Sequence, residues 1–468
     1  MKAIVLILFN ILLLSVTYAN DSTKILSYKS FLEIVKQYHP IAKQAGLQID
    51  KANAGLLVAR AGFDPTLQAG GANKTLDGIN YYRNNSIELS IPTWYGISLQ
   101  TGIEYLGGIR NNPDQTLGQS SFAGIQISLA KDLLMDKRRA ALQDAKIMQQ
   151  AAEQEKRKMI NDLLMDATNG YWNWVQAYYI LQSYNEIIEV NRKRYSFVLS
   201  AYQLGERPAI DTVEAIAQLQ QFEYLQSEAW LNAQNASIAL SGFLWTNQEI
   251  PFEWDNSIVP EKKMEELFNT IQFPEMNGLL EDIKKTHPEL NLYALKIKSL
   301  GIEKKLKFQD LLPKLDLKYN QLGKNYNIAA TAAKTLFDNN YRYGIQFSMP
   351  LRLSQGRGAY KMAKIKISET IWQQRQKELD ITNKVKNYYN ELVNYKNQVG
   401  ILKRNYDNYM RLQKGEEMRF LNGESSLFLV NSRENKSLET WIKLTQQTIK
   451  LNKTAWSLEW MAGRLWRY

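Results

Sequence analysis

Apolar residues between positions 381 and 409 recur in alternating steps of four and three, the heptad pattern of a long helix packed against a partner helix. The residues in this pattern are Ile381, Val385, Tyr388, Leu392, Tyr395, Val399, Leu402, Tyr406 and Tyr409. No proline lies between Gly358 and Leu421, so one helix can run through the whole stretch. Such a helix would be about 90–100 Å long, far longer than the average globular helix.

A second stretch of this kind lies upstream. It loosens around Asn185 and Arg192, and no proline interrupts the chain between Gln119 and Arg207. Its apolar positions are Ile160, Leu164, Ala167, Tyr171, Trp174, Tyr178 and Leu181, followed by Ile188, Tyr195, Leu199 and Tyr202. We interpret the aromatic residues of both stretches as helix packing, so the sequence predicts two very long helices.

Before each long helix the period of the pattern changes to two, which is typical of strands with one apolar face. The clearest case is 341–349, where apolar residues alternate with polar or small ones. Further strands are predicted at 125–129 and 315–319, and a pair at 87–91 and 97–105 is joined by a turn at 92–96. Segments rich in Asn, Gly and Asp predict loops at 73–85, 107–118 and 323–340.

Several features occur twice in the same order. His39-Pro40 begins a segment that ends at Pro65, and His287-Pro288 begins one that ends at Pro313. In each copy the first and the last proline of the segment are 25 residues apart. Gly-Ile-Gln-Ile-Ser at 124–128 matches Gly-Ile-Gln-Phe-Ser at 344–348, and Gly-Glu at 205–206 matches Gly-Glu at 423–424. This order predicts a duplication, with about 28 extra residues in the first copy before position 124. Each copy is expected to contain a short helix, strands, a very long helix, a tight turn and a second long helix.

The predicted domains are a signal peptide at 1–19, a first repeat at 20–245, a linker at 246–275 and a second repeat at 276–468. The signal peptide is predicted from Lys2, an apolar run to Leu14, and small residues that permit cleavage after Ala19. We therefore expect an exported protein without a helical membrane anchor.

Composition excludes several kinds of chemistry. The chain has no cysteine and only two histidines, each of which precedes a proline at an expected helix start. The net charge of +11 is spread along helices among Glu and Gln, which does not indicate a nucleic-acid site. No Ser/His/Asp arrangement or phosphate-binding glycine loop appears. We expect no enzyme activity, no metal site and no cofactor.

An exported chain with few strands cannot close a barrel alone, and an open sheet edge in lipid leaves backbone groups without partners. Several chains must therefore combine their strands, and the long helical hairpins can then form the wall of a tube. With the repeated short helix ending in proline, the two Gly-Ile-Gln strands and the two Gly-centred turns, the chain resembles the TolC-like outer-membrane factor (outer membrane efflux protein) family. The resemblance covers almost all of the mature chain.

This resemblance implies a mixed, mainly α fold: a trimeric outer-membrane β-barrel continued by a long α-helical coiled-coil barrel in the periplasm of a Gram-negative bacterium. The family provides the exit duct of efflux pumps and type I secretion systems. The implied partners are two further copies of the chain, a periplasmic adaptor (membrane fusion) protein, an inner-membrane transporter of the RND or ABC type, and outer-membrane lipid.

The resemblance also implies roles for the two turns. The residues implied to dock the adaptor are Gly205, Glu206, Pro208, Gly423, Glu424 and Ser426. Those implied to form the periplasmic aperture are Asp211, Arg419, Phe420, Leu427, Leu429 and Val430. Family members carry two Asp residues six and nine positions after the second Gly, where this chain has Leu429 and Ser432. We therefore expect closure by helix packing around Leu427, Leu429 and Val430, with Arg419 as the partner of Asp211, unless Asp211 merely caps its own helix.

Two alternatives stay open at this point. A secreted or periplasmic coiled-coil scaffold or adhesin would explain the long helices and export, but not the alternating strands. The insertion from about Gly78 to Leu106 either adds two strands to each chain, giving eighteen in a trimer, or forms a separate hairpin that leaves the family's usual twelve.

Overall fold

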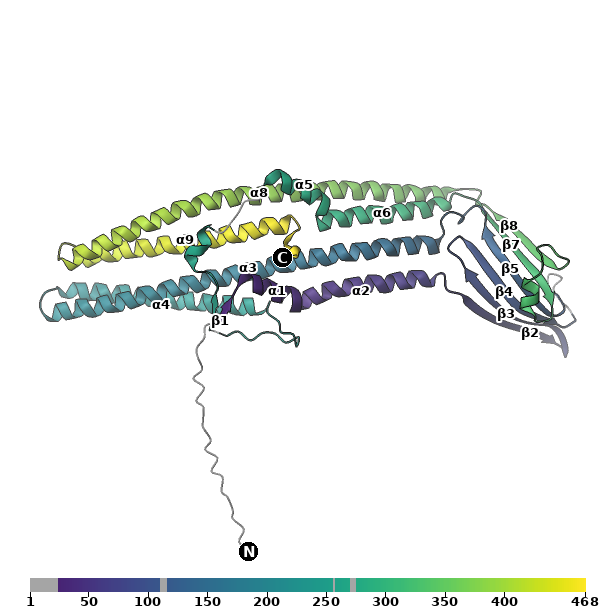
Figure 1. Ribbon diagram of the computed structural model, residues 1–468, viewed down its shortest axis with the longest axis horizontal. Coiled ribbons are helices and arrows are strands. Elements are labelled where there is room, and N and C mark those ends of the chain that lie inside the picture. Colours follow the sequence, from purple (N-terminus) through teal and green to yellow (C-terminus); the bar gives the residue numbers. More distant parts are fainter. Residues whose placement is uncertain (1–23, 110–115, 256, 270–274) are drawn as a thin grey trace, which may run out of the picture.

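The computed structural model describes residues 24–109, 116–255, 257–269 and 275–468. The molecule is a long helical rod with a β-sheet at one end and two helix-to-helix turns at the other (Figure 1). The predicted signal peptide at 1–19 lies outside the described residues. No helix in the described ranges is both long enough and apolar enough to cross a membrane.

The helices occur in two series of the same order and similar length. The first series is α1 (Tyr28–Tyr38), α2 (Pro40–Ala61), α3 (Lys137–Gln203) and α4 (Ala209–Ser241), and the second is α5 (Met276–Thr286), α6 (Pro288–Gln309), α8 (Ser354–Leu421) and α9 (Leu427–Met461). Helices α3 and α8 have 67 and 68 residues, so both predicted long helices are confirmed. Each forms a hairpin, α3 with α4 and α8 with α9. This matches the element order predicted for a duplication, which itself stays a prediction.

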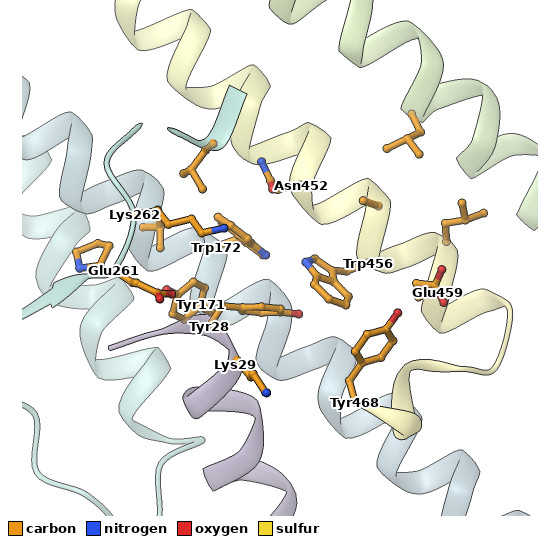
Figure 2. A pocket seen from close by; sticks show the side chains of 16 residues that line it. Tyr28, Lys29, Tyr171, Trp172, Glu261, Lys262, Asn452, Trp456, Glu459 and Tyr468 are labelled. Atoms are coloured by element: carbon orange, nitrogen blue, oxygen red, sulfur yellow. The ribbon is translucent and has the colours of Figure 1, made fainter. Parts of the chain in front are cut away.

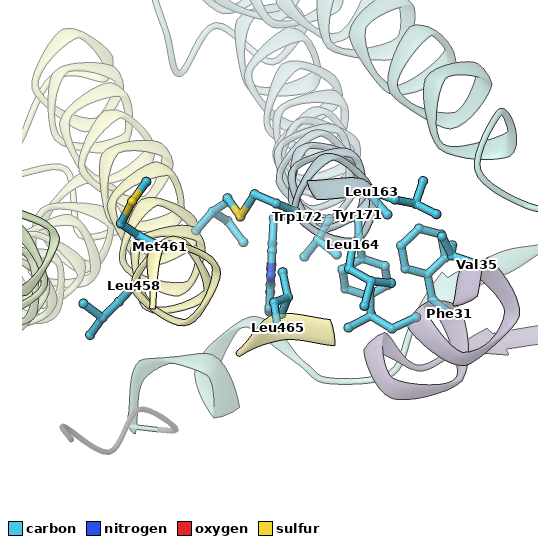
Figure 3. Packing of buried hydrophobic residues seen from close by; sticks show 14 of the residues in the cluster. Phe31, Val35, Leu163, Leu164, Tyr171, Trp172, Leu458, Met461 and Leu465 are labelled. Carbon is cyan, nitrogen blue, oxygen red and sulfur yellow. The ribbon is translucent and has the colours of Figure 1, made fainter. Parts of the chain in front are cut away.

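The heptad residues form the core between the rods. Ile381, Val385, Leu392 and Val399 of α8 are buried, as are Leu164, Tyr171 and Trp174 of α3, and they belong to one apolar cluster. Figure 3 shows Phe31 and Val35 of α1 beside Leu163, Leu164 and Tyr171 of α3. The aromatic residues of the heptads therefore serve packing, as predicted, except for Tyr202 near the end of α3, which is 44% exposed.

The two histidines begin helices α2 and α6. His39 Nδ1 accepts a hydrogen bond from the backbone N–H of Ile41, and His287 Nδ1 accepts one from the N–H of Glu289, both at 3.2 Å. Pro40 and Pro288 follow in the first helical turn, where a missing N–H costs nothing. Burial lowers the pKa of both histidines, which favours the neutral form that can accept these bonds.

The sheet has six antiparallel strands in the order β2-β3-β4-β5-β7-β8. The strands are β2 (Thr66–Leu76), β3 (Ile79–Pro92), β4 (Ile97–Gly107), β5 (Gly118–Ser128), β7 (Lys314–Lys324) and β8 (Tyr341–Ser348). The strand pair predicted around the 92–96 turn is confirmed as β3 and β4. Four strands thus come from the first half of the chain and two from the second, and the extra hairpin belongs to the sheet.

The predicted loop at 73–85 is wrong, because these residues contain the β2–β3 hairpin. Asp77 and Gly78 form its turn with φ angles of 52° and 76°. An Asp-Gly pair with positive φ at both positions is the favoured two-residue hairpin connection. The predicted loop at 323–340 contains the short helix α7 (Ile328–Ala332), and part of the one at 107–118 lies outside the described residues.

The segment that joins the two series contains β6 (Ile258–Pro260) and the 3-10 helix η1 (Met264–Asn269). Strand β6 pairs in parallel with β1 (Lys24–Leu26) at the start of the chain. A final 3-10 helix, η2 (Leu465–Arg467), returns the C-terminus to the middle of the rod (Figure 1). The predicted domain boundaries, including the linker at 246–275, stay a prediction.

Candidate functional site

The two helix-to-helix turns have the same backbone geometry. Gly205 and Gly423 adopt φ angles of 78° and 79°, in the left-handed region. The N–H of Glu206 donates to the carbonyl of Ala201 at 2.9 Å, and the N–H of Glu424 donates to that of Arg419 at 2.8 Å. Each glycine therefore ends its long helix in a Schellman motif, as the Gly-Glu repeat indicated.

The side chains that follow the glycines differ. Ser426 caps α9 by accepting a hydrogen bond from the N–H of Leu429 at 3.4 Å, whereas Pro208 provides no side-chain cap to α4. All six predicted docking residues of the turns are exposed. Exposed apolar side chains surround them, with Leu204, Ile210, Leu421 and Phe428 each more than 60% exposed. The turns thus present an accessible surface of mixed polarity.

Arg207 of the first turn reaches across to the second hairpin. Its Nη2 donates a hydrogen bond to the Phe420 carbonyl at 3.1 Å, and its guanidinium lies 3.9 Å from the centre of the Phe420 ring. Its Nη1 lies 3.6 Å from Oδ2 of Asp211. The predicted pairing of Asp211 with Arg419 is therefore wrong within the chain, because Asp211 faces Arg207 of the preceding turn and Arg419 instead lies 3.8 Å from Glu416.

A small apolar cluster lies beneath this contact. Phe420, Leu427 and Val430 are at most 4% exposed and pack with Val198 and Ala215 of the first hairpin. Leu429, which we expected in this cluster, is 38% exposed and points elsewhere. Of the predicted aperture residues, the structure brings together Asp211, Phe420, Leu427 and Val430, and it leaves Arg419 and Leu429 outside.

A buried ion pair joins the hairpins further from the turns. Glu434 of α9 is fully buried, and both of its carboxylate oxygens accept hydrogen bonds from Arg194 of α3 at 2.8 Å. Asn191 Nδ2 donates to the same carboxylate at 2.9 Å. Nearby, the amide groups of Gln218 on α4 and Asn435 on α9 bond each other in both directions. The two hairpins are therefore held together by specific polar contacts as well as by apolar packing.

The sheet at the other end of the rod has one apolar and one polar face. Register places Leu67 opposite Leu89, Leu99 opposite Ile125, and Leu315 opposite Phe347, all on one face. Gln68 pairs with Glu88 and Asp316 with Gln346 on the other. Strands β2 and β8 are the edges of the sheet, and each has one strand partner among the described residues.

Several solved structures share this architecture. The Campylobacter jejuni CmeC outer membrane channel matches with a TM-score of 0.65 and 14% identity over 93% of this chain and 85% of that one. The Neisseria gonorrhoeae MtrE outer membrane channel in its open state matches with a TM-score of 0.67 and 13% identity over 93% and 88%. Vibrio cholerae VceC matches with a TM-score of 0.62 and 13% identity over 94% and 95%.

The chain has the fold of these outer-membrane channels. The resemblance to the TolC-like family is thereby confirmed for the fold. No protein-family model and no curated protein sequence matches the chain.

Within this fold, sequence reasoning missed the residues that link the hairpins. Arg207, in the turn before α4, stands four residues before Asp211, and this spacing of opposite charges was a usable signal for their pairing. Arg194 and Asn191 lie where the heptad of α3 loosens, around Asn185 and Arg192. Polar residues at loosened heptad positions are a usable signal for such buried links.

Among the described residues, no cluster of three or more His, Asp or Glu side chains could hold a metal ion. The arrangement instead offers an apolar sheet face, two exposed turns and polar contacts between helices.

Proposed function

We propose that this protein is the outer-membrane exit duct of a tripartite efflux pump in a Gram-negative bacterium, acting as a homotrimer with a large periplasmic portion. The observation that carries the proposal is the six-stranded sheet with one apolar face and two free edges at the end of a long helical rod. The alternative function is to serve as the duct of a type I secretion system, which uses the same kind of channel.

The free edges support assembly from several chains. A strand edge in lipid leaves N–H and C=O groups without partners, so a membrane-embedded sheet must be closed. Six strands are fewer than the eight of the smallest known barrels. Pairing β8 of one copy with β2 of the next closes the sheet, and three copies contribute eighteen strands, the larger of the two numbers considered from the sequence.

The apolar face supports a lipid environment. Leu67, Ile345 and Phe347 are 64–71% exposed although they are large and apolar. A contiguous exposed apolar surface of this kind marks a membrane or protein interface. In a barrel the alternation along each strand would place these side chains in lipid and the polar face toward the lumen.

The opposite end of the rod would then lie in the periplasm. There the exposed turn residues Gly205, Glu206, Pro208, Gly423, Glu424 and Ser426 would dock the adaptor, which connects the duct to an RND or ABC transporter. The aperture would be closed by the Arg207–Phe420 contact and the packing of Leu427 and Val430. With Leu429 and Ser432 in place of acidic residues, we expect only weak cation selectivity, and strong block by micromolar trivalent cations would contradict this.

Disulfide cross-linking tests the assembly directly, because the chain contains no cysteine of its own. Gln68→Cys on β2 is combined in turn with Arg342→Cys, Gly344→Cys and Gln346→Cys on β8, since all four positions lie on the polar face. One register should give a ladder that ends at the trimer, and each single variant should give none.

The same experiment separates the duct from the scaffold or adhesin. A scaffold without a barrel would have no reason to pair β8 with β2, so no pair would give more than background cross-linking. A ladder ending at a dimer would contradict the trimer. Extraction from the outer-membrane fraction only by detergent is expected for the duct and not for the scaffold.

A further inference from the structure

A cavity of about 460 Å³ lies in the middle of the rod. Helices α1, α3 and α9, the segment after β6 and the C-terminal residue meet around it (Figure 2). Helix α1 and the C-terminus are far from both the sheet and the turns (Figure 1). The cavity is therefore separate from the lipid-facing and docking surfaces of the proposed duct.

Aromatic rings form much of its wall. The ring centre of Tyr28 lies 4.8 Å from that of Trp456 and 5.6 Å from that of Trp172. Trp456 in turn lies 5.3 Å from Tyr468. Cavities of several hundred Å³ lined mainly by aromatic side chains are typical of sites for small organic molecules. The flat walls favour an occupant with a planar aromatic body.

One buried donor in this wall has no partner. Trp172 is only 5% exposed, and its indole Nε1 makes no hydrogen bond with the described residues. In Figure 2 this nitrogen points toward the space between Trp172 and Trp456. Other indoles of the rod are satisfied, for example Trp441 by Ser183 and Trp460 by Asp162. An unsatisfied buried N–H is costly, so an occupant with an acceptor group is favoured.

The charges around the cavity favour an anion. Lys29 and Lys262 line it and form no ion pair with the described residues, and the Lys262 side chain extends toward Trp172 (Figure 2). Glu459 is neutralised by two hydrogen bonds from Arg464, at 2.9 and 2.7 Å. The carboxylate of the last residue, Tyr468, accepts a hydrogen bond from the Lys36 ammonium at 3.3 Å. Glu261 is then the one remaining negative side chain among the lining residues, so the two lysines leave the balance positive.

We propose that this cavity binds an amphipathic organic anion. Its planar aromatic body would lie against the aromatic wall formed by Trp172, Trp456 and Tyr28, and its anionic group would accept hydrogen bonds from Trp172 Nε1 and the Lys262 ammonium. Binding would join α1, α3 and α9 and so stabilise the middle of the rod.

Isothermal titration calorimetry of the detergent-solubilised full chain with naphthalene-2-sulfonate tests this. We expect saturable binding at one site per chain and a rise in melting temperature with ligand concentration. Trp172→Phe keeps a ring but loses the donor, and Lys262→Gln loses the charge of a half-buried side chain that forms no ion pair with the described residues. Each should weaken binding about tenfold, as expected for a lost hydrogen bond to a charged group.

The matched control is Trp372→Phe, which changes an exposed indole on α8 that lies beside Arg375. It should leave the affinity unchanged, and the uncharged 2-methylnaphthalene should bind at least tenfold more weakly than the sulfonate. Absence of saturable binding would overturn the proposal. Equal affinity of the parent chain and Lys262→Gln, or of the sulfonate and the uncharged compound, would also overturn it.

Discussion

The two turns at the end of the rod share one backbone conformation but differ in the contacts of their side chains. Gly205 and Gly423 share their φ angle and their hydrogen-bond pattern. Three residues before each glycine stands an aromatic ring, yet Tyr202 is 44% exposed and Phe420 only 4%. Phe420 packs against the first hairpin, and Arg207, two residues after the first glycine, covers its ring.

The second turn cannot return this contact. Ser425 occupies the position that corresponds to Arg207, and it instead bonds Glu416 of its own hairpin. The first turn therefore provides the cation and the second provides the ring and the carbonyl. A glycine fixes the shape of such a turn, whereas the residue two positions later decides whether the turn is linked to its neighbour.

The strongest link between the hairpins is expected to be the buried ion pair rather than the turns. Arg194→Met would leave the Glu434 carboxylate buried without its main partner, at a cost of about 3–5 kcal/mol in the free energy of unfolding. Guanidinium denaturation of the detergent-solubilised chain measures it. The double variant Arg194→Met, Glu434→Met should recover most of the loss, because an apolar pair of similar size can replace a buried ion pair.

If Arg194→Met lowers the free energy of unfolding by less than about 1 kcal/mol, the buried Glu434 carboxylate does not depend on Arg194, and the hairpins are joined mainly by apolar packing. Gln218→Ala is a suitable control. It removes an exposed amide contact with Asn435 and should cost about 0.5 kcal/mol or less.

The asymmetry of the turns predicts unequal effects of two arginine substitutions. Arg207→Ala removes the contact with the Phe420 ring and the hydrogen bond to its carbonyl, which together contribute about 1–2 kcal/mol. Arg419→Ala removes an exposed side chain and should change the free energy of unfolding by no more than about 0.5 kcal/mol. If both substitutions lowered the free energy of unfolding equally in the same denaturation assay, the proposed difference between the two turns would be contradicted.

Much of this fold follows from local patterns in the sequence. Residues close together in the chain determine the long helices, the His-Pro helix starts and the glycine turns. The heptads, Pro40 and Gly423 therefore sufficed to predict these elements. The β2–β3 hairpin could also have been predicted, because Asp77-Gly78 is a strong signal for a two-residue turn. The high content of Asn, Gly and Asp in this segment led instead to the prediction of a loop.

The links between hairpins were harder to predict because they depend on register between distant helices. The spacing of Arg207 and Asp211 can be seen in the sequence, but the contact of Arg207 with Phe420 of the other hairpin depends on how α4 and α8 are placed. In the same way, Leu429 and Val430 are neighbours of similar character, and only the direction of the helix decides that Val430 is buried.

The shared backbone predicts equal costs for equal changes at the glycines. Gly205→Ala and Gly423→Ala each place a Cβ at φ near +80°, where no neighbouring atom lies within 4 Å, so only backbone strain applies. We expect each to lower the free energy of unfolding by about 1 kcal/mol. A difference larger than the error of the two denaturation curves would show that the turns are less alike than their angles.

The two histidine caps extend the comparison to pH. Because burial lowers the pKa of His287, the unfolded chain binds the proton first as the pH falls. The stability contribution is therefore complete above pH about 6.5 and declines below it. His287→Asn keeps a capping side chain and should flatten the melting temperature between pH 7 and pH 5, while His39→Asn, at a more exposed site, should have a smaller effect. An unchanged pH profile in His287→Asn would contradict this role.

Single-channel recording in planar lipid bilayers tests the central claim, that this chain assembles into a duct. The purified protein should insert from detergent and give discrete conductance steps. Arg207→Ala, which frees the turns from each other, should give larger or longer-lived steps than Arg419→Ala. The absence of steps from the parent chain and from both variants, in preparations that are folded and membrane-inserted, would contradict the account.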